Sequence, residues 1–134
     1  MSDAEIRVAI NSNQDIVTAR QRGRALAAEL GFSATDATLV ATAISELARN
    51  IVSYARHGEI TLKKIQVSSR RGVLIIASDD GPGIPDIRQA LRDGFSTSGS
   101  LGLGLPGVRR LMDEFEITSR PGRGTIVAVK KWRQ

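Results

Sequence analysis

The sequence predicts an α+β fold, a two-layer sandwich in which helices cover one face of a mixed β-sheet. Two observations lead to this fold class. Several short segments alternate apolar and polar residues with the period of two that is typical of strands, and two longer segments repeat apolar residues at spacings of three and four, as amphipathic helices do. These segments follow one another as a strand, two helices, two strands, a loop-rich region with a helix, and two final strands. With 134 residues, the chain is predicted to form a single domain over residues 1–134.

The first half of the chain is predicted to hold one strand and two helices. Alternation of apolar and charged residues indicates a half-buried strand over residues 5–10. Apolar spacings of three and four then predict an amphipathic helix over residues 13–30, which Gly31 ends. Ser33 is suited to the N-cap of a second helix, whose apolar stripe continues to about Ala55.

The second half is predicted to hold two hairpins, separated by a loop-rich region and a short helix. The first hairpin joins residues 59–67 to residues 73–78. Residues 79–104 contain six glycines and two prolines, a composition that predicts loops around a ligand. A helix near residues 105–115 then leads to the second hairpin. Its strands are residues 116–119 and 125–132.

Composition excludes several classes of chemistry. The sequence contains no cysteine and a single histidine, His57, which excludes disulfides, cysteine catalysis and zinc sites of the cysteine or multi-histidine type. The net charge of +5 would suit a nucleic-acid binder, but aromatic residues make up only 4% and are not interleaved with the basic ones, so we expect no nucleic-acid role. No segment approaches the roughly 20 apolar residues of a membrane span and the N-terminus lacks a secretory pattern, so we expect a cytoplasmic protein without a membrane role.

Two motifs carry carboxylates beside other polar groups. Glu46 and Asn50 are four residues apart and therefore share one face of the second predicted helix. Alone, this pair is as well explained by the polar rim of a buried face. Asp79 follows a predicted strand and precedes Gly81 and Gly83; such an aspartate can accept a hydrogen bond from an exocyclic amine while glycines let the backbone pass a planar base. The alternative explanation is a plain turn.

Two further motifs are rich in glycine. Residues 99–105 place glycines directly before a predicted helix, where free backbone amides and the helix dipole favour phosphate. Residues 122–125, Gly-Arg-Gly-Thr, enter the last predicted strand, and a hairpin turn alone would explain them. Neither motif is specific by itself.

Taken together and in this order, the four motifs resemble the N, G1, G2 and G3 boxes of the GHKL superfamily of ATPases and kinases, which share the Bergerat fold. There is no P-loop and no protein-kinase signature of the H-R-D or D-F-G type. The short chain has no room for the phospho-acceptor hairpin of histidine kinases or the added domains of gyrase-like members. It is most similar to the small bacterial serine kinases of stressosome and partner-switching modules.

The resemblance implies a role for each matching residue. Glu46 would be the general base, Asn50 would bind Mg²⁺, and Asp79 would bind the adenine amine of ATP with help from Thr125 through water. Arg49 would contact a phosphate or the partner protein. Tyr54 stands where histidine kinases often carry Lys or His, which argues against phosphohistidine chemistry. The remaining nucleotide-binding positions would be Gly81, Gly83, Ile84, Ser96, Thr97, Ser98, Gly99, Leu101, Gly102, Leu103, Gly104 and Leu105, with residues 84–101 forming approximately the lid over ATP.

The resemblance also implies a function. It predicts a serine/threonine-protein kinase that uses Mg²⁺ and ATP to phosphorylate STAS-domain antagonist proteins of a stressosome, and that then activates a downstream effector, a PP2C-type phosphatase or another signalling enzyme. Two alternatives stay open. One is an anti-sigma factor serine kinase, and the other is a binding module without catalysis, in which ATP only orders the lid.

Overall fold

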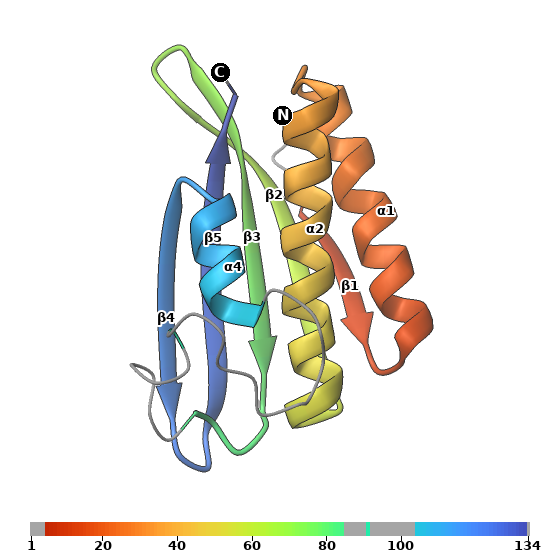
Figure 1. The fold of residues 1–134 in the computed structure, drawn as a ribbon, viewed down its shortest axis with the longest axis vertical. Coiled ribbons are helices and arrows are strands. Elements are labelled where there is room, and N and C mark those ends of the chain that lie inside the picture. The colour runs from red at the N-terminus through yellow and green to blue at the C-terminus, as the bar shows by residue number, and fades with distance from the viewer. Residues whose placement is uncertain (1–4, 85–90, 92–103, 134) are drawn as a thin grey trace.

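The computed structural model describes residues 5–84, 91 and 104–133. Their elements are the strand β1 (Ile6–Ile10), the helices α1 (Asn13–Glu29) and α2 (Ala34–Asn50), the π-helix η1 (Ile51–Ala55), the strands β2 (Gly58–Val67) and β3 (Arg70–Asp79), the helix α4 (Gly104–Leu111), and the strands β4 (Glu114–Arg120) and β5 (Gly124–Trp132). Figure 1 shows α1, α2 and α4 side by side over one face of the sheet, with α2 in the middle. The α+β two-layer sandwich is confirmed.

The sheet corrects one part of the prediction, because it is antiparallel throughout and not mixed. Its strand order is β1-β2-β3-β5-β4, and all four neighbouring pairs are antiparallel. The chain leaves β3 through the region that holds α4 and enters β4, which runs parallel to β3. The hairpin then inserts β5 between these two strands, so that no parallel pair forms.

The core lies between the helices and the covered face of the sheet. α2 and the first residue of η1 contribute a stripe of residues that are almost completely buried, Val40, Ile44, Leu47 and Ile51. From the sheet, the alternate residues of β2, β3 and β5 meet them, as the strand period of two requires. These are Ile60, Leu62, Val73, Ile75, Ala77, Val127 and Val129.

Two helix ends differ from the sequence-based expectation. The second predicted helix was expected to continue to about Ala55, but it is α-helical only to Asn50. Its last turn is the π-helix η1, which a hydrogen bond of 2.7 Å from the Arg56 amide to the Ile51 carbonyl closes. Helix α4 ends at Leu111 and not near Phe115, because the next residues join the sheet: the Asp113 amide donates to the Lys130 carbonyl of β5 at 2.9 Å. No helix in the described ranges is long and apolar enough to cross a membrane.

Candidate functional site

Glu46 is a buried carboxylate between α2 and the first turn of α4. Its residue exposure is only 8%. Oε1 accepts a hydrogen bond of 3.3 Å from the backbone amide of Gly104, the first residue of α4, and Oε2 forms an ion pair of 2.6 Å with Nη1 of Arg49. Both partners, the N-terminal amide of α4 and the guanidinium group, bring positive charge to the carboxylate. Glu46 belongs to the first motif and Gly104 to the third, so this hydrogen bond joins the two motifs.

Asn50 lies one turn beyond Glu46, where α2 changes into the π-helix η1. The side chain is partly buried, and none of the described residues forms a hydrogen bond with its amide group. Short π-helical turns inside helices are often found at functional sites. Arg56, which ends this turn, has a positive φ of 72°, a conformation that non-glycine residues seldom adopt. Within the described residues, the side-chain amide of Asn50 at this irregular helix end is therefore not engaged by another protein group.

Asp79 and Thr125 lie opposite each other at one edge of the site. Asp79 is the last residue of β3 and pairs in register with Thr125 of β5. The Asp79 Oδ1 accepts a hydrogen bond of 2.9 Å from the Gly81 amide, which fixes the carboxylate at the strand end. Thr125 reaches this position because the second predicted hairpin places it near the start of β5. The second and fourth motifs therefore meet, as the resemblance predicts.

Two glycines hold the segments of this site close together. A Cβ on Gly81 would lie 2.6 Å from the Cβ of Ala55, so the turn after β3 contacts the end of η1. Gly124 has a positive φ of 87°, and a Cβ there would collide with the carbonyl oxygen of Asp79. Packing of the backbone alone thus explains why these positions are glycine, whether or not they also contact a base.

Ser119 is a member of this cluster that the sequence analysis missed. Its hydroxyl accepts a hydrogen bond of 2.7 Å from the Ile84 amide and lies 2.7 Å from the Thr125 hydroxyl. Gly83 precedes Ile84 in the same segment, and the amide of Gly122 donates to the Pro82 carbonyl at 2.7 Å. The only signal in the sequence is that Ser119 ends one strand of a predicted hairpin whose other strand begins at Thr125.

The phosphate end of the predicted site is described only in part. Gly104 opens α4, and Leu105 is buried in the core, so that only its backbone could face a nucleotide. The predicted lid, residues 84–101, falls outside the described residues except for Ile84 and Leu91. The predicted nucleotide-binding residues that also lie outside them are Ser96, Thr97, Ser98, Gly99, Leu101, Gly102 and Leu103.

A magnesium ion fits the chemistry of the residues at the end of α2. Among the described residues, no group of three histidines or carboxylates could hold a metal by itself. Mg²⁺ accepts few protein ligands when phosphate oxygens and water complete its octahedron. The amide oxygen of Asn50, which no described residue engages, is a ligand of the right type. Glu46, one turn away, adds negative charge next to it.

Comparison with known proteins identifies the family of this chain. Residues 35–133 match the family of histidine kinase-, DNA gyrase B- and HSP90-like ATPases. The serine/threonine-protein kinase RsbT of Bacillus subtilis (strain 168) is 55% identical over 125 residues, which cover 93% of this chain and 94% of RsbT. An anti-sigma F factor of Caldanaerobacter subterraneus subsp. tengcongensis is 30% identical over 129 residues, which cover 92% of this chain and 89% of that protein.

Solved structures show the same fold. The mycobacterial sensor histidine kinase MprB superposes with a TM-score of 0.57 at 14% identity, covering 99% of both chains. The catalytic domain of the histidine kinase ThkA gives a TM-score of 0.54 at 18% identity, covering 99% of this chain and 97% of that one. The predicted enzyme class, a protein serine/threonine kinase, is the class of the relative with 55% identity. The chain belongs to the family of histidine kinase-, DNA gyrase B- and HSP90-like ATPases, as the four motifs predict.

Proposed function

We propose that this protein is a serine/threonine kinase that transfers the γ-phosphate of ATP to a hydroxyl group of a STAS-domain partner. The placement of Glu46 carries the proposal: a buried carboxylate lies at the first turn of α4, where nucleotide phosphates would be held by backbone amides. A module that only binds ATP has no need for a base at this point. RsbT, which is 55% identical, is named a serine/threonine-protein kinase.

In this proposal, the nucleotide lies between the end of β3 and the start of α4. Asp79 accepts a hydrogen bond from the adenine amine, with Thr125 opposite it in the sheet. Gly81, Gly83 and Ile84 border the base. The amide oxygen of Asn50 holds Mg²⁺, which when bound offsets the charge of the phosphate groups. These roles are the ones that the resemblance to the family implies. They involve the segments whose contacts with one another are described above.

Glu46 then acts as general base. The serine or threonine hydroxyl gives its proton to a carboxylate oxygen, the hydroxyl oxygen bonds to the γ-phosphorus, and the bond from that phosphorus to the bridging oxygen breaks, which leaves ADP. A carboxylate has about four lone-pair sites, and the contacts with Gly104 and Arg49 occupy two of them. Capacity for the proton therefore remains while both neighbours hold the group in place.

Phosphorylation would also end the complex. A phosphoryl group adds about two negative charges to the partner surface, which disfavours its contact with the kinase through repulsion and desolvation. The released kinase would then activate a second partner, a PP2C-type phosphatase or another signalling enzyme. This sequence of events makes the protein a partner-switching kinase that works in the cytoplasm.

The test is transfer of radiolabelled phosphate from Mg-ATP to a panel of STAS-domain proteins. We expect acid-stable label on serine or threonine, which disappears in the Glu46→Ala and Asn50→Ala variants. ATP binding without label across a broad panel would contradict the proposal and favour a nucleotide-gated binding module.

A second candidate is an anti-sigma factor kinase, which the anti-sigma F factor relatives at 30% identity favour. The two candidates differ in the protein that the chain retains. A pull-down with immobilised kinase and a non-hydrolysable ATP analogue, which prevents the transfer that would end the complex, would retain a sigma factor in this case, and a STAS-domain protein in the first.

A further inference from the structure

Three polar side chains lie in one row across the sheet at the edge of the proposed nucleotide site. Asp79 of β3 pairs in register with Thr125 of β5, and Thr125 pairs in register with Ser119 of β4. Because side chains alternate along a strand, Asp79 and Thr125 share the covered face of the sheet with the buried pair of Ala77 and Val127. All three polar residues are partly buried. Ser119 therefore lies behind Thr125, on the side away from Asp79.

The hydroxyl group of Ser119 takes part in three hydrogen bonds. It accepts from the Ile84 amide at 2.7 Å, donates to the Gly124 carbonyl at 3.2 Å and lies 2.7 Å from the Thr125 hydroxyl. A backbone amide can only donate, a carbonyl can only accept, and a hydroxyl has one proton and two lone pairs. Only one assignment of protons satisfies all three contacts. The proton of Ser119 goes to the carbonyl, and Thr125 donates its own proton to Ser119.

This assignment fixes the hydrogen-bonding role of Thr125. Because its proton is directed at Ser119, the Thr125 oxygen can only accept hydrogen bonds from other groups. The carboxylate of Asp79, its neighbour on the other side, is an acceptor as well. A water molecule that bridged the two would donate both of its protons to them and present only lone pairs to a ligand. At this edge of the site, a ligand must therefore supply the donors.

We infer that Ser119 is a positioning residue that makes the site prefer a purine with an exocyclic amine over one with a carbonyl at the same ring position. The inference rests on the proposed function, which places the base beside Asp79. There the amine of adenine donates, whereas the carbonyl oxygen of hypoxanthine or guanine would face acceptors only. Ser119 needs no contact with the nucleotide for this role, because it acts through the proton of Thr125.

Loss of the Ser119 hydroxyl would have two separable effects. The proton of Thr125 would lose its acceptor, so that Thr125 could rotate and donate to a carbonyl oxygen, which relieves the repulsion that disfavours hypoxanthine. The Ile84 amide would lose its acceptor too, and a weaker hold on the segment after β3 would lower the affinity for every purine alike. The ratio of two purine affinities therefore reports the first effect and is insensitive to the second.

The test measures the affinities of ADP and inosine diphosphate, which carry an amine and a carbonyl at the same ring position, by competition with a fluorescent ADP analogue. Ser119→Ala is compared with Ser119→Thr, which keeps the hydroxyl group, and with Thr118→Ala, which removes an exposed hydroxyl on the other face of β4. Thr125→Val and the double variant that combines it with Ser119→Ala show whether Ser119 acts through Thr125. Circular dichroism establishes that each variant is folded.

We expect Ser119→Ala to lower the preference for ADP over inosine diphosphate about tenfold, as for the loss of one oriented hydrogen bond, and Ser119→Thr and Thr118→Ala to keep it within about twofold. With Thr125→Val already present, Ser119→Ala should not change the preference further. An equal loss of affinity for both nucleotides, or additive effects in the double variant, would overturn the inference in favour of a merely structural role. Equal binding of both nucleotides by the wild type would overturn it as well.

The outcome is independent of phosphate transfer, because only nucleotide binding is measured. A failed kinase assay would count against the proposed function and leave the measured preference as a test of Ser119. An unchanged preference in Ser119→Ala would overturn the role of Ser119 without contradicting the kinase.

Discussion

Replacement of Glu46 by glutamine separates the chemical role of this residue from its structural role. Glutamine keeps an oxygen that can accept from the Gly104 amide, but it cannot take up the proton and it loses the ion pair with Arg49. General bases contribute about 10²–10⁴-fold to rates, so we expect phosphate transfer to fall by that factor. The Arg49 side chain is 41% exposed, and an ion pair at such a position stabilises the fold by only about 0.5–1 kcal/mol.

The assay measures initial rates of phosphate transfer, ATP affinity by calorimetry and the Tm of the same preparations. A loss of about 1 kcal/mol lowers the Tm of a chain of this size by about 4 °C, so the variant stays folded at assay temperature. ATP affinity should change less than about threefold. Glu29→Gln is a matched control, because Glu29 forms an exposed ion pair with Lys64, far from the site in sequence. A Glu46→Gln variant that retains more than about a tenth of the wild-type rate would refute the role of this carboxylate as base.

Four other substitutions test the remaining parts of the structure. Asn50→Ala should weaken Mg-ATP binding by about tenfold, equivalent to about 1.4 kcal/mol, without changing the binding of ATP in EDTA, as calorimetry can show. Asp79→Asn should lower ATP affinity by about tenfold, since hydrogen bonds to charged groups contribute about 1.5–3 kcal/mol, and a competition assay with labelled ATP measures this. Gly124→Ala should cost about 1–3 kcal/mol of unfolding free energy in urea, because it forces a side chain onto the Asp79 carbonyl at a positive φ. Leu47→Ala, at a position that is 1% exposed, should cost about 2–5 kcal/mol in the same measurement.

The helices and strands with regular apolar periods were predictable from the sequence. Helix α1 spans Asn13–Glu29, close to the predicted range of residues 13–30, because the repeating residues Ile16, Ala19 and Leu26 are the buried ones. The Ser33 N-cap is confirmed: its side chain accepts a hydrogen bond of 3.0 Å from the Asp36 amide. In these segments, local propensity and burial favour the same structure, so a single sequence contains enough information.

Features that depend on contacts between distant segments were not predictable. The apolar pattern of residues 105–115 is equally compatible with a helix that continues to Phe115, and only the hydrogen bonds of Asp113 with β5 end it at Leu111. Whether neighbouring strands are parallel or antiparallel was also not predictable, because it depends on where the hairpin of β4 and β5 joins the sheet. Within the site, the resemblance of the motifs predicted that Asp79 and Thr125 serve the same site, but not that the hydroxyl of Ser119 lies beside Thr125 on its other side.

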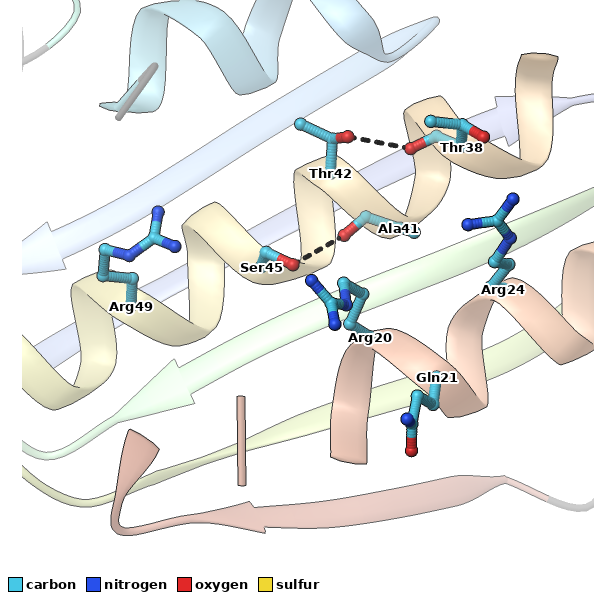
Figure 2. Close-up of a pocket in the computed structure, with 8 residues that line it drawn as sticks. All are labelled: Arg20, Gln21, Arg24, Thr38, Ala41, Thr42, Ser45 and Arg49. Atoms are coloured by element: carbon cyan, nitrogen blue, oxygen red, sulfur yellow. Dashed lines mark hydrogen bonds between the residues drawn. The ribbon is translucent and has the colours of Figure 1, made fainter. Parts of the chain in front are cut away.

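A groove of about 500 Å³ between α1 and α2, in which Arg20 and Arg24 of α1 face α2 (Figure 2), shows a third reason why the sequence does not predict every feature of the structure. The core stripe of α2, Val40, Ile44 and Leu47, continues to Ile51 in η1, with spacings of four, three and four. The groove residues Thr38, Thr42, Ser45 and Arg49 repeat these spacings two positions earlier. Two residues correspond to a rotation of about 200°, which turns the second stripe away from the core stripe and toward α1, with Thr38 exposed and Ser45 buried. Apolar periodicity reveals the first stripe only, because serine and threonine do not by themselves indicate which side of a helix packs against a neighbour. What distinguishes them is the neighbouring helix, whose arginines convert a neutral polar face into one side of a basic groove.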